Sequence, residues 1–225
     1  MRTVTLYDGT QLPVMGLGTW AMGGRSRPDP TQDQRALQAL AAAFAVGYTH
    51  IDTAEMYANG HTEELVGQAL RGEDRARFFL TTKVRPPNLG YRRTLQSIDG
   101  SLRRLGVEQI DLFLIHWRDQ TPLAETFRAL NEAVRVGKVR TLGVSNFDLA
   151  ELQEAQALSE TSIVTNQVPY SVATRSYVRN GVIPYCQQHG IVVTAYSPVE
   201  EGRLHVKTAL AEIAAQHGAT PYQIA

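Results

Sequence analysis

Four side chains that can carry a charge or a proton stand at the ends of short apolar segments. Asp52 follows the run in "THIDT" with Tyr57 five residues later, Lys83 is near the end of "FFLTTKV", and His116 ends "IDLFLIH". A phenol titrates near ~10 and releases its proton poorly at neutral pH. An ammonium group beside it favours the phenolate, so Lys83 is predicted to lower the pKa of Tyr57 and make it a better acid.

The same four residues indicate which reaction they serve. A lysine after a Phe-Phe-Leu run is unfavourable to bury alone, so we expect Asp52 to pair with Lys83. His116 offers a hydrogen-bond donor that can orient a carbonyl oxygen. The set can protonate an oxygen but contains no convincing nucleophile. A carbonyl protonated at oxygen needs a hydride at carbon, and this indicates a nicotinamide cofactor.

Three later apolar segments also end in polar or aromatic residues. They end in Ser145 with Asn146, Asn166 with Gln167, and Tyr196 with Ser197. The amides of Asn146 and Gln167 suit a carboxamide, and the ring of Tyr196 suits a flat aromatic face. These types fit the nicotinamide interpretation.

The segments that position these residues alternate with segments of helical period. The apolar runs read "MGLGT", "THIDT", "FFLTTKV", "IDLFLIH", "VRTLGVS", "SIVTNQV" and "IVVTAYS". Leu37, Leu40, Ala41 and Phe44 show the i, i+3, i+4, i+7 spacing of a helix between two of them. Strand and helix recur about every thirty residues, the length of a βαβ unit, which predicts a parallel sheet.

A parallel sheet of this kind is either open and doubly wound or closed into a (β/α)8 TIM barrel. The open form usually carries a glycine-rich phosphate turn after its first strand, directly before a helix. "GLGTWAMGG" is rich in glycine, but no helix follows at once. We therefore predict the α/β barrel, in which the carboxyl ends of all strands face one opening.

The two ends of the chain complete this prediction. "TVTLYDGTQLPV" alternates on both sides of Asp8-Gly9 and predicts a β-hairpin before the barrel. Only seven barrel strands follow, and Thr220-Pro221 begins a helix at the end of the sequence. We expect residues 1–225 to form a single barrel domain that is incomplete at its C-terminus, with strands 1–7 present.

Composition narrows the class of protein. The chain has 225 residues, 22 basic and 22 acidic side chains, a net charge of +0 and one cysteine, Cys186. This balance favours neither nucleic acid nor an anionic membrane as a partner. A single cysteine permits no internal disulfide, and no stretch reaches the ~18–20 apolar residues of a membrane span. We expect a cytoplasmic protein.

These motifs, in their order and spacing, resemble those of the aldo-keto reductase family along essentially the whole chain. The matching stretches are "GLGTW", "HIDTAEMYANG", "EELVGQAL", "LTTKV", "IDLFLIHW", "GKVRTLGVSNF", "TNQVPYS" and "TAYSPV". The resemblance implies a (β/α)8 barrel that reduces an aldehyde or ketone, a small-molecule carbonyl, with NADP(H), or in some relatives NAD(H), and without a metal. It also implies a monomer, as in many relatives.

The resemblance assigns a role to each site residue. It implies a catalytic set in which Tyr57 donates the proton, made up of Asp52, Tyr57, Lys83 and His116. It places cofactor contacts at Thr19, Ser145, Asn146, Gln167, Tyr196 and Ser197, and it places the substrate pocket at Trp20 and Trp117. Many relatives have a proline soon after the histidine, where this chain reads "HWRDQ". The residues that grip the adenosine end in the family follow strand eight, so the sequence does not decide between NADP and NAD.

Other interpretations remain open at this stage. Taken singly, each site residue has a structural explanation, and Asn146 before "FDLAEL" would serve as an N-terminal residue of a helix. A metal-dependent barrel hydrolase would use His50 and Asp52, which share a strand face, together with His116. A third alternative is a barrel that binds nicotinamide but has a regulatory role.

Overall fold

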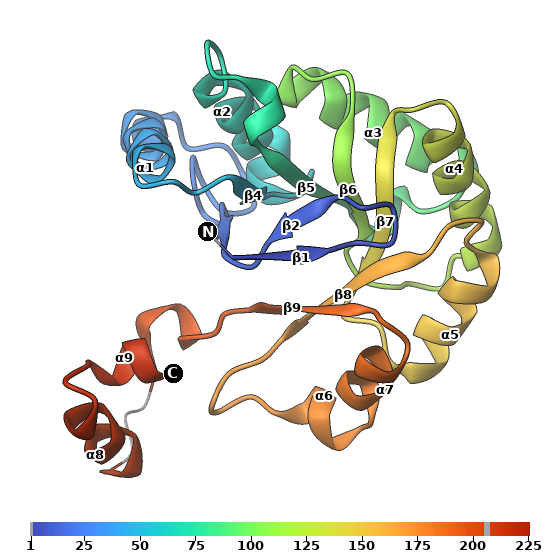
Figure 1. The fold of residues 1–225 in the computed structure, drawn as a ribbon. Helices are drawn as coiled ribbons and strands as arrows, with labels where there is room; N and C mark the ends of the chain where they lie inside the picture. Colours follow the sequence, from blue (N-terminus) through green and yellow to red (C-terminus); the bar gives the residue numbers. More distant parts are fainter. Residues whose placement is uncertain (1, 205–207) are drawn as a thin grey trace.

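The computed structural model describes residues 2–204 and 208–225 and confirms the predicted barrel architecture. In these residues a seven-stranded parallel sheet runs in the order β3-β4-β5-β6-β7-β8-β9. The strands are β3 (Gly16–Gly18), β4 (His50–Asp52), β5 (Phe79–Val84), β6 (Ile110–Ile115), β7 (Val139–Ser145), β8 (Ile163–Pro169) and β9 (Val192–Tyr196). They curve into a nearly closed barrel, with β3 and β9 at its two edges (Figure 1).

Helices cover the outside of this barrel. They are α1 (Asp33–Ala45), α2 (His61–Ala69), α3 (Tyr91–Leu105), α4 (Leu123–Arg135), α5 (Leu149–Leu158), α6 (Ser176–Arg179) and α7 (Val182–Gln188). After β9 come α8 (Thr208–Gln216) and α9 (Pro221–Ile224), which lie apart from the other helices in Figure 1. Thr220 caps α9 through a capping box, as its sequence predicts.

Short 3-10 helices form several of the loops. They are η1 (Pro30–Gln32), η2 (Tyr57–Gly60), η3 (Arg75–Arg77), η4 (Pro86–Asn88) and η5 (Glu200–Gly202). Two of them, η2 and η4, follow β4 and β5 at the carboxyl ends of these strands. The loops that carry Tyr57 and Arg85 are therefore neighbours.

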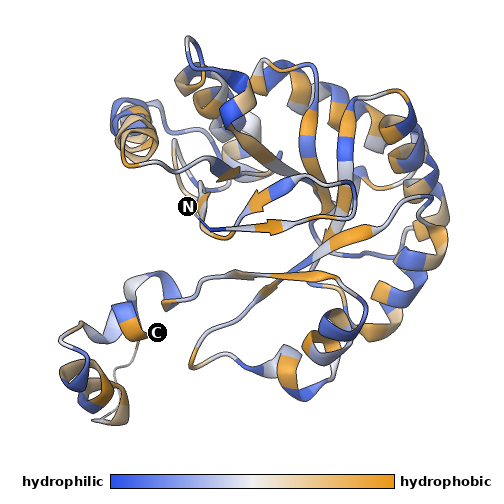
Figure 2. Cartoon of the chain, in the orientation of Figure 1, coloured by the Kyte–Doolittle hydropathy of each residue, from blue (hydrophilic) through white to orange (hydrophobic). Residues whose placement is uncertain are grey.

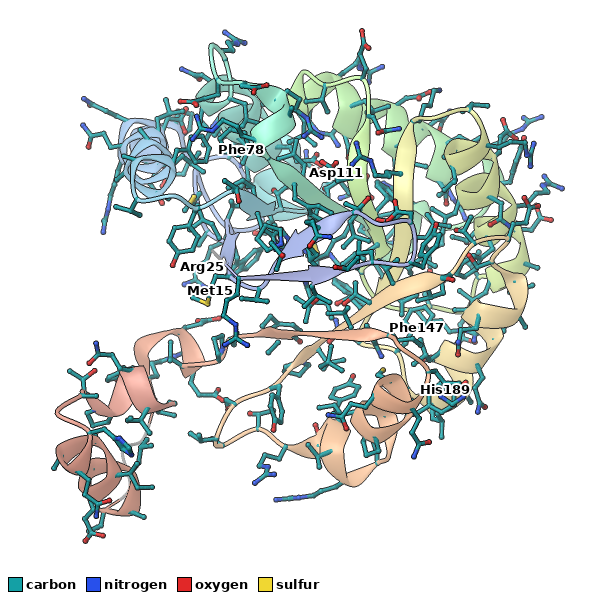
Figure 3. All side chains as sticks on the ribbon, in the orientation of Figure 1. Met15, Arg25, Phe78, Asp111, Phe147 and His189 are labelled. Carbon is teal, nitrogen blue, oxygen red and sulfur yellow. The ribbon has the colours of Figure 1, made fainter. Side chains whose placement is uncertain are left out.

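Two hydrophobic clusters occupy the two faces of the strands, because successive side chains alternate across a strand. Leu80 and Val84 of β5 join the larger cluster against the helices, whereas Phe79 joins a smaller cluster with Leu112 and Leu114 of β6. Phe78 and Phe147, labelled in Figure 3, belong to the larger cluster. Figure 2 shows that the surrounding helices carry both hydrophobic and hydrophilic residues.

The predicted hairpin is present as β1 (Thr3–Thr5) and β2 (Gln11–Pro13). Val4 pairs with Leu12 in its antiparallel register. Leu6 and Leu12 are buried in the smaller cluster with Phe79 and Leu112. The hairpin therefore packs on the residues near the amino ends of the strands and leaves their carboxyl ends free for a site.

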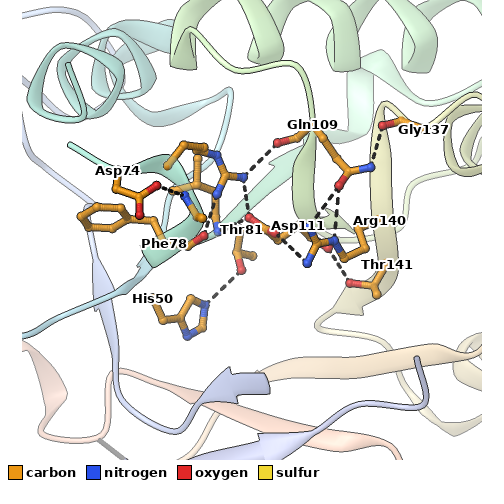
Figure 4. Close-up of polar contacts among 12 residues, drawn as sticks. His50, Asp74, Phe78, Thr81, Gln109, Asp111, Gly137, Arg140 and Thr141 are labelled. Carbon is orange, nitrogen blue, oxygen red and sulfur yellow. Dashed lines mark hydrogen bonds and ion pairs between the residues drawn. The ribbon is translucent and has the colours of Figure 1, made fainter. Parts of the chain in front are cut away.

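Near the amino ends of β5, β6 and β7, Asp111 is the centre of a polar network (Figure 4). Its Oδ2 accepts from the backbone N–H of Leu80 at 2.9 Å and from Arg75 Nη2 at 2.5 Å. Arg140 Nη1 lies 3.6 Å from Oδ1, and the Thr141 hydroxyl donates to the Asp111 carbonyl oxygen at 2.6 Å. One aspartate therefore links three adjacent strands.

Candidate active site

The Asp52–Lys83 pair is at the base of the site. Lys83, on β5, is fully buried, and its Nζ lies 2.5 Å from Asp52 Oδ1 at the end of the neighbouring strand β4. The same ammonium donates to the Thr53 carbonyl oxygen at 2.8 Å. Burial alone lowers the pKa of a lysine, but attraction to Asp52 and Tyr57 outweighs it and raises the pKa of Lys83. Lys83 is therefore an ammonium at neutral pH.

Tyr57 is brought to this pair by the tight turn η2. Its backbone N–H bonds to the Ala54 carbonyl oxygen, and Ala58 and Asn59 then adopt left-handed conformations with φ of 46° and 54°. Such conformations are uncommon for residues other than glycine. The turn reverses the chain at once and directs α2 away, leaving the Tyr57 hydroxyl 3.5 Å from Lys83 Nζ.

The pKa of Tyr57 is raised, so the expectation that Lys83 produces a lowered pKa is wrong in its net direction. Burial is the largest cause, because it disfavours the phenolate, and Asp52 acts in the same sense. Lys83 does act in the lowering direction but does not prevail. Tyr57 therefore stays protonated in the resting site and is available as a proton source.

His116 completes the set that the sequence predicts at the strand ends. Its ring lies edge-on to Tyr57, with 5.8 Å between the ring centroids. Burial first, and Lys83 second, lower the pKa of His116 to about 3. The imidazole is therefore neutral at physiological pH and keeps one N–H that can donate a hydrogen bond.

Asn146 ties three strand ends together. It has a left-handed backbone, with φ of 61°, and its amide donates to the His116 carbonyl oxygen and to Ser145 Oγ, both at 3.0 Å. Its Oδ1 accepts from the Tyr196 hydroxyl at 2.9 Å. The alternative that Asn146 starts a helix is wrong, because Asp148 is the N-cap of α5 and forms a capping box with Glu151.

Gln167 and Ser145 also contact this network. Gln167 Nε2 donates to the second Asp52 oxygen, Oδ2, at 2.8 Å, so each oxygen of this carboxylate has a donor. Ser145 Oγ donates to the Gln167 carbonyl oxygen at 2.9 Å. These contacts hold the amide side chains of Gln167, on β8, and Asn146, directly after β7, at the opening of the barrel.

A pocket of about 510 Å³ opens above these groups. Ten of the residues predicted for the site line it, namely Trp20, Asp52, Tyr57, His116, Trp117, Ser145, Asn146, Gln167, Tyr196 and Ser197. Lys83 lies beneath the pocket, fully buried. Thr19 is also fully buried, and its hydroxyl donates to the Asp52 carbonyl oxygen at 3.0 Å rather than lining the pocket.

Sequence reasoning missed three further lining residues, Gly18, Met56 and Glu201. Gly18 and Met56 adjoin predicted site segments, so their proximity in sequence was a usable signal. Glu201 lies in η5 with φ of 54° and pairs with Arg203 at 2.8 Å. Its place in the pocket depends on the path of the loop after β9, which no periodicity indicates.

Two glutamates that lie outside this pocket hold the segment around Tyr57 in place. Glu55 Oε1 accepts from the Arg85 backbone N–H at 2.7 Å. Glu63 of α2 is fully buried and contacts Arg104 Nε and the Thr82 hydroxyl, each at 2.6 Å. Burial raises the pKa of Glu63 against the opposing effect of Arg104. These contacts fix the start of α2 against β5 and α3.

The residues of the metal-site alternative are not arranged as a set of ligands. His50 Nε2 lies 3.0 Å from the Thr81 hydroxyl, whereas Asp52 is paired with Lys83. In the described part of the chain, no three His, Cys, Asp or Glu side chains are grouped so as to hold a metal ion. In the same residues, each helix is too short or too polar to cross a bilayer.

A family model described as "Aldo/keto reductase family" matches residues 14–225. Methylglyoxal reductase YeaE of Escherichia coli (strain K12) is 40% identical over 229 residues, covering 99% of this chain and 78% of that protein. Glyoxal reductase of Bacillus subtilis (strain 168) is 34% identical over 225 residues, covering 99% of this chain and 76% of that protein.

Solved structures resemble the whole described fold. A thermostable aldo-keto reductase, Tm1743, in complex with the inhibitor epalrestat, matches with a TM-score of 0.96 and 44% identity, over 100% of this chain and 83% of that chain. An aldo/keto reductase from Klebsiella pneumoniae in complex with NADP and acetate matches with a TM-score of 0.86 and 40% identity, over 99% of this chain and 79% of that chain.

Proposed function

The chain belongs to the aldo/keto reductase family, and on this premise we propose that it reduces a small aldehyde or ketone with NADP(H). The observation that carries the proposal is the position of Tyr57 at a pocket, 3.5 Å from the buried ammonium of Lys83. A protonated phenol beside a fixed cation can donate its proton and remain stabilised as a phenolate afterwards. The similar enzyme from Klebsiella pneumoniae binds NADP, which supports this cofactor.

The polar side of the pocket fits the nicotinamide end of such a cofactor. Ser145, Asn146 and Gln167 present hydroxyl and amide groups that match a carboxamide. Tyr196 offers a half-exposed aromatic face, and Ser197 lies beside it with φ of 51°. We assign the carboxamide contact to the three polar residues, the ring contact to Tyr196 and a phosphate contact to Ser197. Thr19 would act indirectly, by holding the backbone at Asp52.

The reduction adds one hydride and one proton across the carbonyl bond. When bound, the reduced nicotinamide supplies the hydride to the carbonyl carbon. His116 donates a hydrogen bond that orients the carbonyl oxygen, and Tyr57 transfers its hydroxyl proton to that oxygen. Lys83 stabilises the resulting phenolate, and Asp52 holds Lys83 in place. The phenolate then regains a proton from solvent, which restores the resting site.

The apolar side of the pocket favours a compact substrate. Trp20, Met56 and Trp117 line it, and the Trp20 ring lies 5.0 Å from the Tyr57 ring, centroid to centroid. The E. coli and B. subtilis relatives are named for methylglyoxal and glyoxal, which are small dicarbonyls. We therefore propose small aldehydes and ketones, with α-dicarbonyls as the first class to test.

The test is NADPH oxidation followed by absorbance, with methylglyoxal and an aromatic aldehyde as substrates. Replacing Tyr57 by Phe removes the proton donor, and we expect kcat to fall by about 10²–10⁴-fold, the range of general acid catalysis. NADPH binding, measured by fluorescence, should be nearly unchanged. EDTA-treated protein should retain its activity.

The matched control is Tyr91→Phe, because this tyrosine also loses one hydroxyl but lies on α3, where it donates to Glu132. Turnover in Tyr91→Phe should stay close to that of the wild type. A Tyr57→Phe variant with near-normal kcat would show that Tyr57 is not the acid. Tight NADPH binding without turnover of any carbonyl would instead favour the regulatory barrel.

A further inference from the structure

A second pocket, of about 310 Å³, lies behind the turn that carries Tyr57. Its lining includes Glu55 and Asn59 from the segment around Tyr57, and Arg85 from the end of β5. The helix α3 contributes Arg93, Arg103 and Arg104. None of its lining residues lines the pocket above Tyr57, so the two are separate cavities on opposite sides of one turn.

The second pocket has a strong excess of positive charge. Four guanidinium groups line it against the single carboxylate of Glu55. Within residues 2–204 and 208–225, Arg104 pairs with Glu63, whereas Arg85, Arg93 and Arg103 have no carboxylate within ion-pair distance. Glu55 does not neutralise them, because its Oε1 already accepts from the Arg85 backbone N–H and the Asn88 amide.

Several of these groups are held in place before any ligand binds. Arg104 is fixed by Glu63 at 2.6 Å, and Arg93 Nε donates to the Leu89 carbonyl oxygen at 3.0 Å. Gly100 provides space beside them, since a Cβ there would lie 2.9 Å from Arg104 Nη1. The Nε of Arg85 is buried and has no hydrogen-bond partner in the described structure. A buried N–H without a partner carries a free-energy cost that a ligand oxygen would remove.

We propose that this pocket binds a small polyanion through a phosphate group. Each guanidinium presents a planar fork of donors that matches the oxygens of phosphate, and several forks around one cavity suit an anion with three or four oxygens. A monocarboxylate would neutralise only one of the three unpaired cations. The cavity volume is at the lower end of small-molecule sites, which favours inorganic phosphate or a small phosphate monoester.

Isothermal titration calorimetry with inorganic phosphate and with glycerol 3-phosphate tests the proposal. The protein is titrated both free and saturated with NADP, so that the phosphate positions of the cofactor site are filled in the second series. We expect saturable binding in both series. Tighter binding of glycerol 3-phosphate would identify an ester as the ligand, and equal or tighter binding of inorganic phosphate would identify the free anion.

Matched variants on α3 distinguish a specific phosphate site from a nonspecific effect of positive charge. Arg93→Gln and Arg103→Gln each remove a lining cation, and we expect the Kd for phosphate to rise about tenfold, the effect of losing one charge-assisted hydrogen bond. The control is Arg92→Gln, because Arg92 lies on the same helix and is exposed like Arg93 and Arg103, but it is not part of the lining. Its Kd should stay within about twofold of the wild type, the scale of an exposed charge.

Two results would overturn the inference. One is the absence of saturable phosphate binding by the wild-type protein. The other is an equal loss in Arg92→Gln and Arg93→Gln, which would mean that the anion responds only to the overall charge of α3. Neither result depends on turnover, so the test of the phosphate site is independent of the proposed reductase activity.

Discussion

The barrel contains two aspartate-centred ion pairs, one at each end of its strands. At the carboxyl ends, Asp52 Oδ1 lies 2.5 Å from Lys83 Nζ, and at the amino ends Asp111 Oδ2 lies 2.5 Å from Arg75 Nη2. The two pairs have the same separation, and in each the aspartate also accepts a second donor, from Gln167 and from the Leu80 backbone. Their surroundings differ.

The difference lies in what each cation contacts beyond the aspartate. Arg75 also donates to the carbonyl oxygens of Phe78 and Gln109, so its additional donors bind backbone (Figure 4). Lys83 instead reaches the Tyr57 hydroxyl, which lines an open pocket. The Arg75 pair therefore has only contacts that hold the fold, whereas the Lys83 pair has one contact with a group that lines a pocket, which is why we propose a role in chemistry for the Lys83 pair alone.

The largest effect is expected from Lys83→Met, which should lower both the turnover rate and the stability of the protein. Removal of the ammonium leaves the Tyr57 phenolate unsupported, and we expect kcat to fall by about 10²–10⁴-fold. It also leaves Asp52 without its cation, which should lower the free energy of unfolding by about 3–5 kcal/mol. Steady-state kinetics and urea denaturation measure the two losses separately.

The double variant Lys83→Met/Tyr57→Phe tests whether Lys83 and Tyr57 act as one unit. If the two residues act as one unit, the double variant should be about as slow as either single variant. A loss equal to the product of the two single losses would mean that each acts alone, and the proposed link between phenol and ammonium would be wrong.

Asp111→Ala should lower the stability of the protein without lowering its turnover rate. It removes the partner of Arg75 and leaves the Leu80 N–H unsatisfied, so we expect a loss of about 3 kcal/mol of unfolding free energy. The value of kcat should stay close to the wild type, because Asp111 lies at the amino ends of the strands. Urea denaturation and NADPH oxidation on the same sample provide both readings.

The control for Asp111→Ala is Asp99→Ala, which removes a half-exposed pair with Lys138. That change should cost less than about 1 kcal/mol, as exposed pairs do. Similar losses in the two variants would contradict the structural importance given to the Asp111 network.

The smallest effect concerns His61, which begins α2 just after the Tyr57 turn. Its Nε2 lies 2.8 Å from Asp33 and its Nδ1 lies 3.0 Å from Glu64. Burial would lower its pKa, but the two carboxylates outweigh burial and raise the pKa of His61. A raised folded-state pKa means that the protonated ring stabilises the fold fully below the unfolded-state pKa of ~6.5, and this contribution is lost as pH rises through the folded-state pKa.

We therefore expect the stability advantage of the wild type over His61→Gln to shrink as pH rises from about 6 to 8, by less than about 1 kcal/mol for a partly exposed group. Urea denaturation of both proteins at each pH cancels the contribution of His116, whose lowered pKa acts in the opposite direction and is common to both. A difference in unfolding free energy that does not change with pH would mean that His61 does not titrate in this range.

The sequence predicts the strands and the grouping of the candidate site residues, because both depend on local pattern. Apolar runs identify β5 and β6, and the parallel arrangement then brings Asp52, Lys83 and His116 to one end of the barrel. The prediction for Tyr57 fails in the sign of its pKa shift, because that sign depends on how deeply the phenol is buried relative to its distance from Lys83. Neither quantity is a property of sequence spacing.

Other features required the folded chain for the same reason. Glu63 follows the helix start like an ordinary exposed acidic residue, yet α2 lies close enough to β5 and α3 to bury it completely. The arginines of the second pocket come from α3 and from the end of β5, and only the packing of that helix beside the Tyr57 turn brings them to one cavity.

The complete burial of Lys83 has a consequence for protein labelling. Acylating reagents attack unprotonated amines that they can reach, and Lys83 fails both conditions because it is enclosed and its pKa is raised. Lys138 has 42% of its side chain exposed and is therefore within reach of such a reagent. Mass spectrometry after brief acetylation should therefore detect modified Lys138 in the native protein, whereas modified Lys83 would appear only in molecules whose barrel has opened.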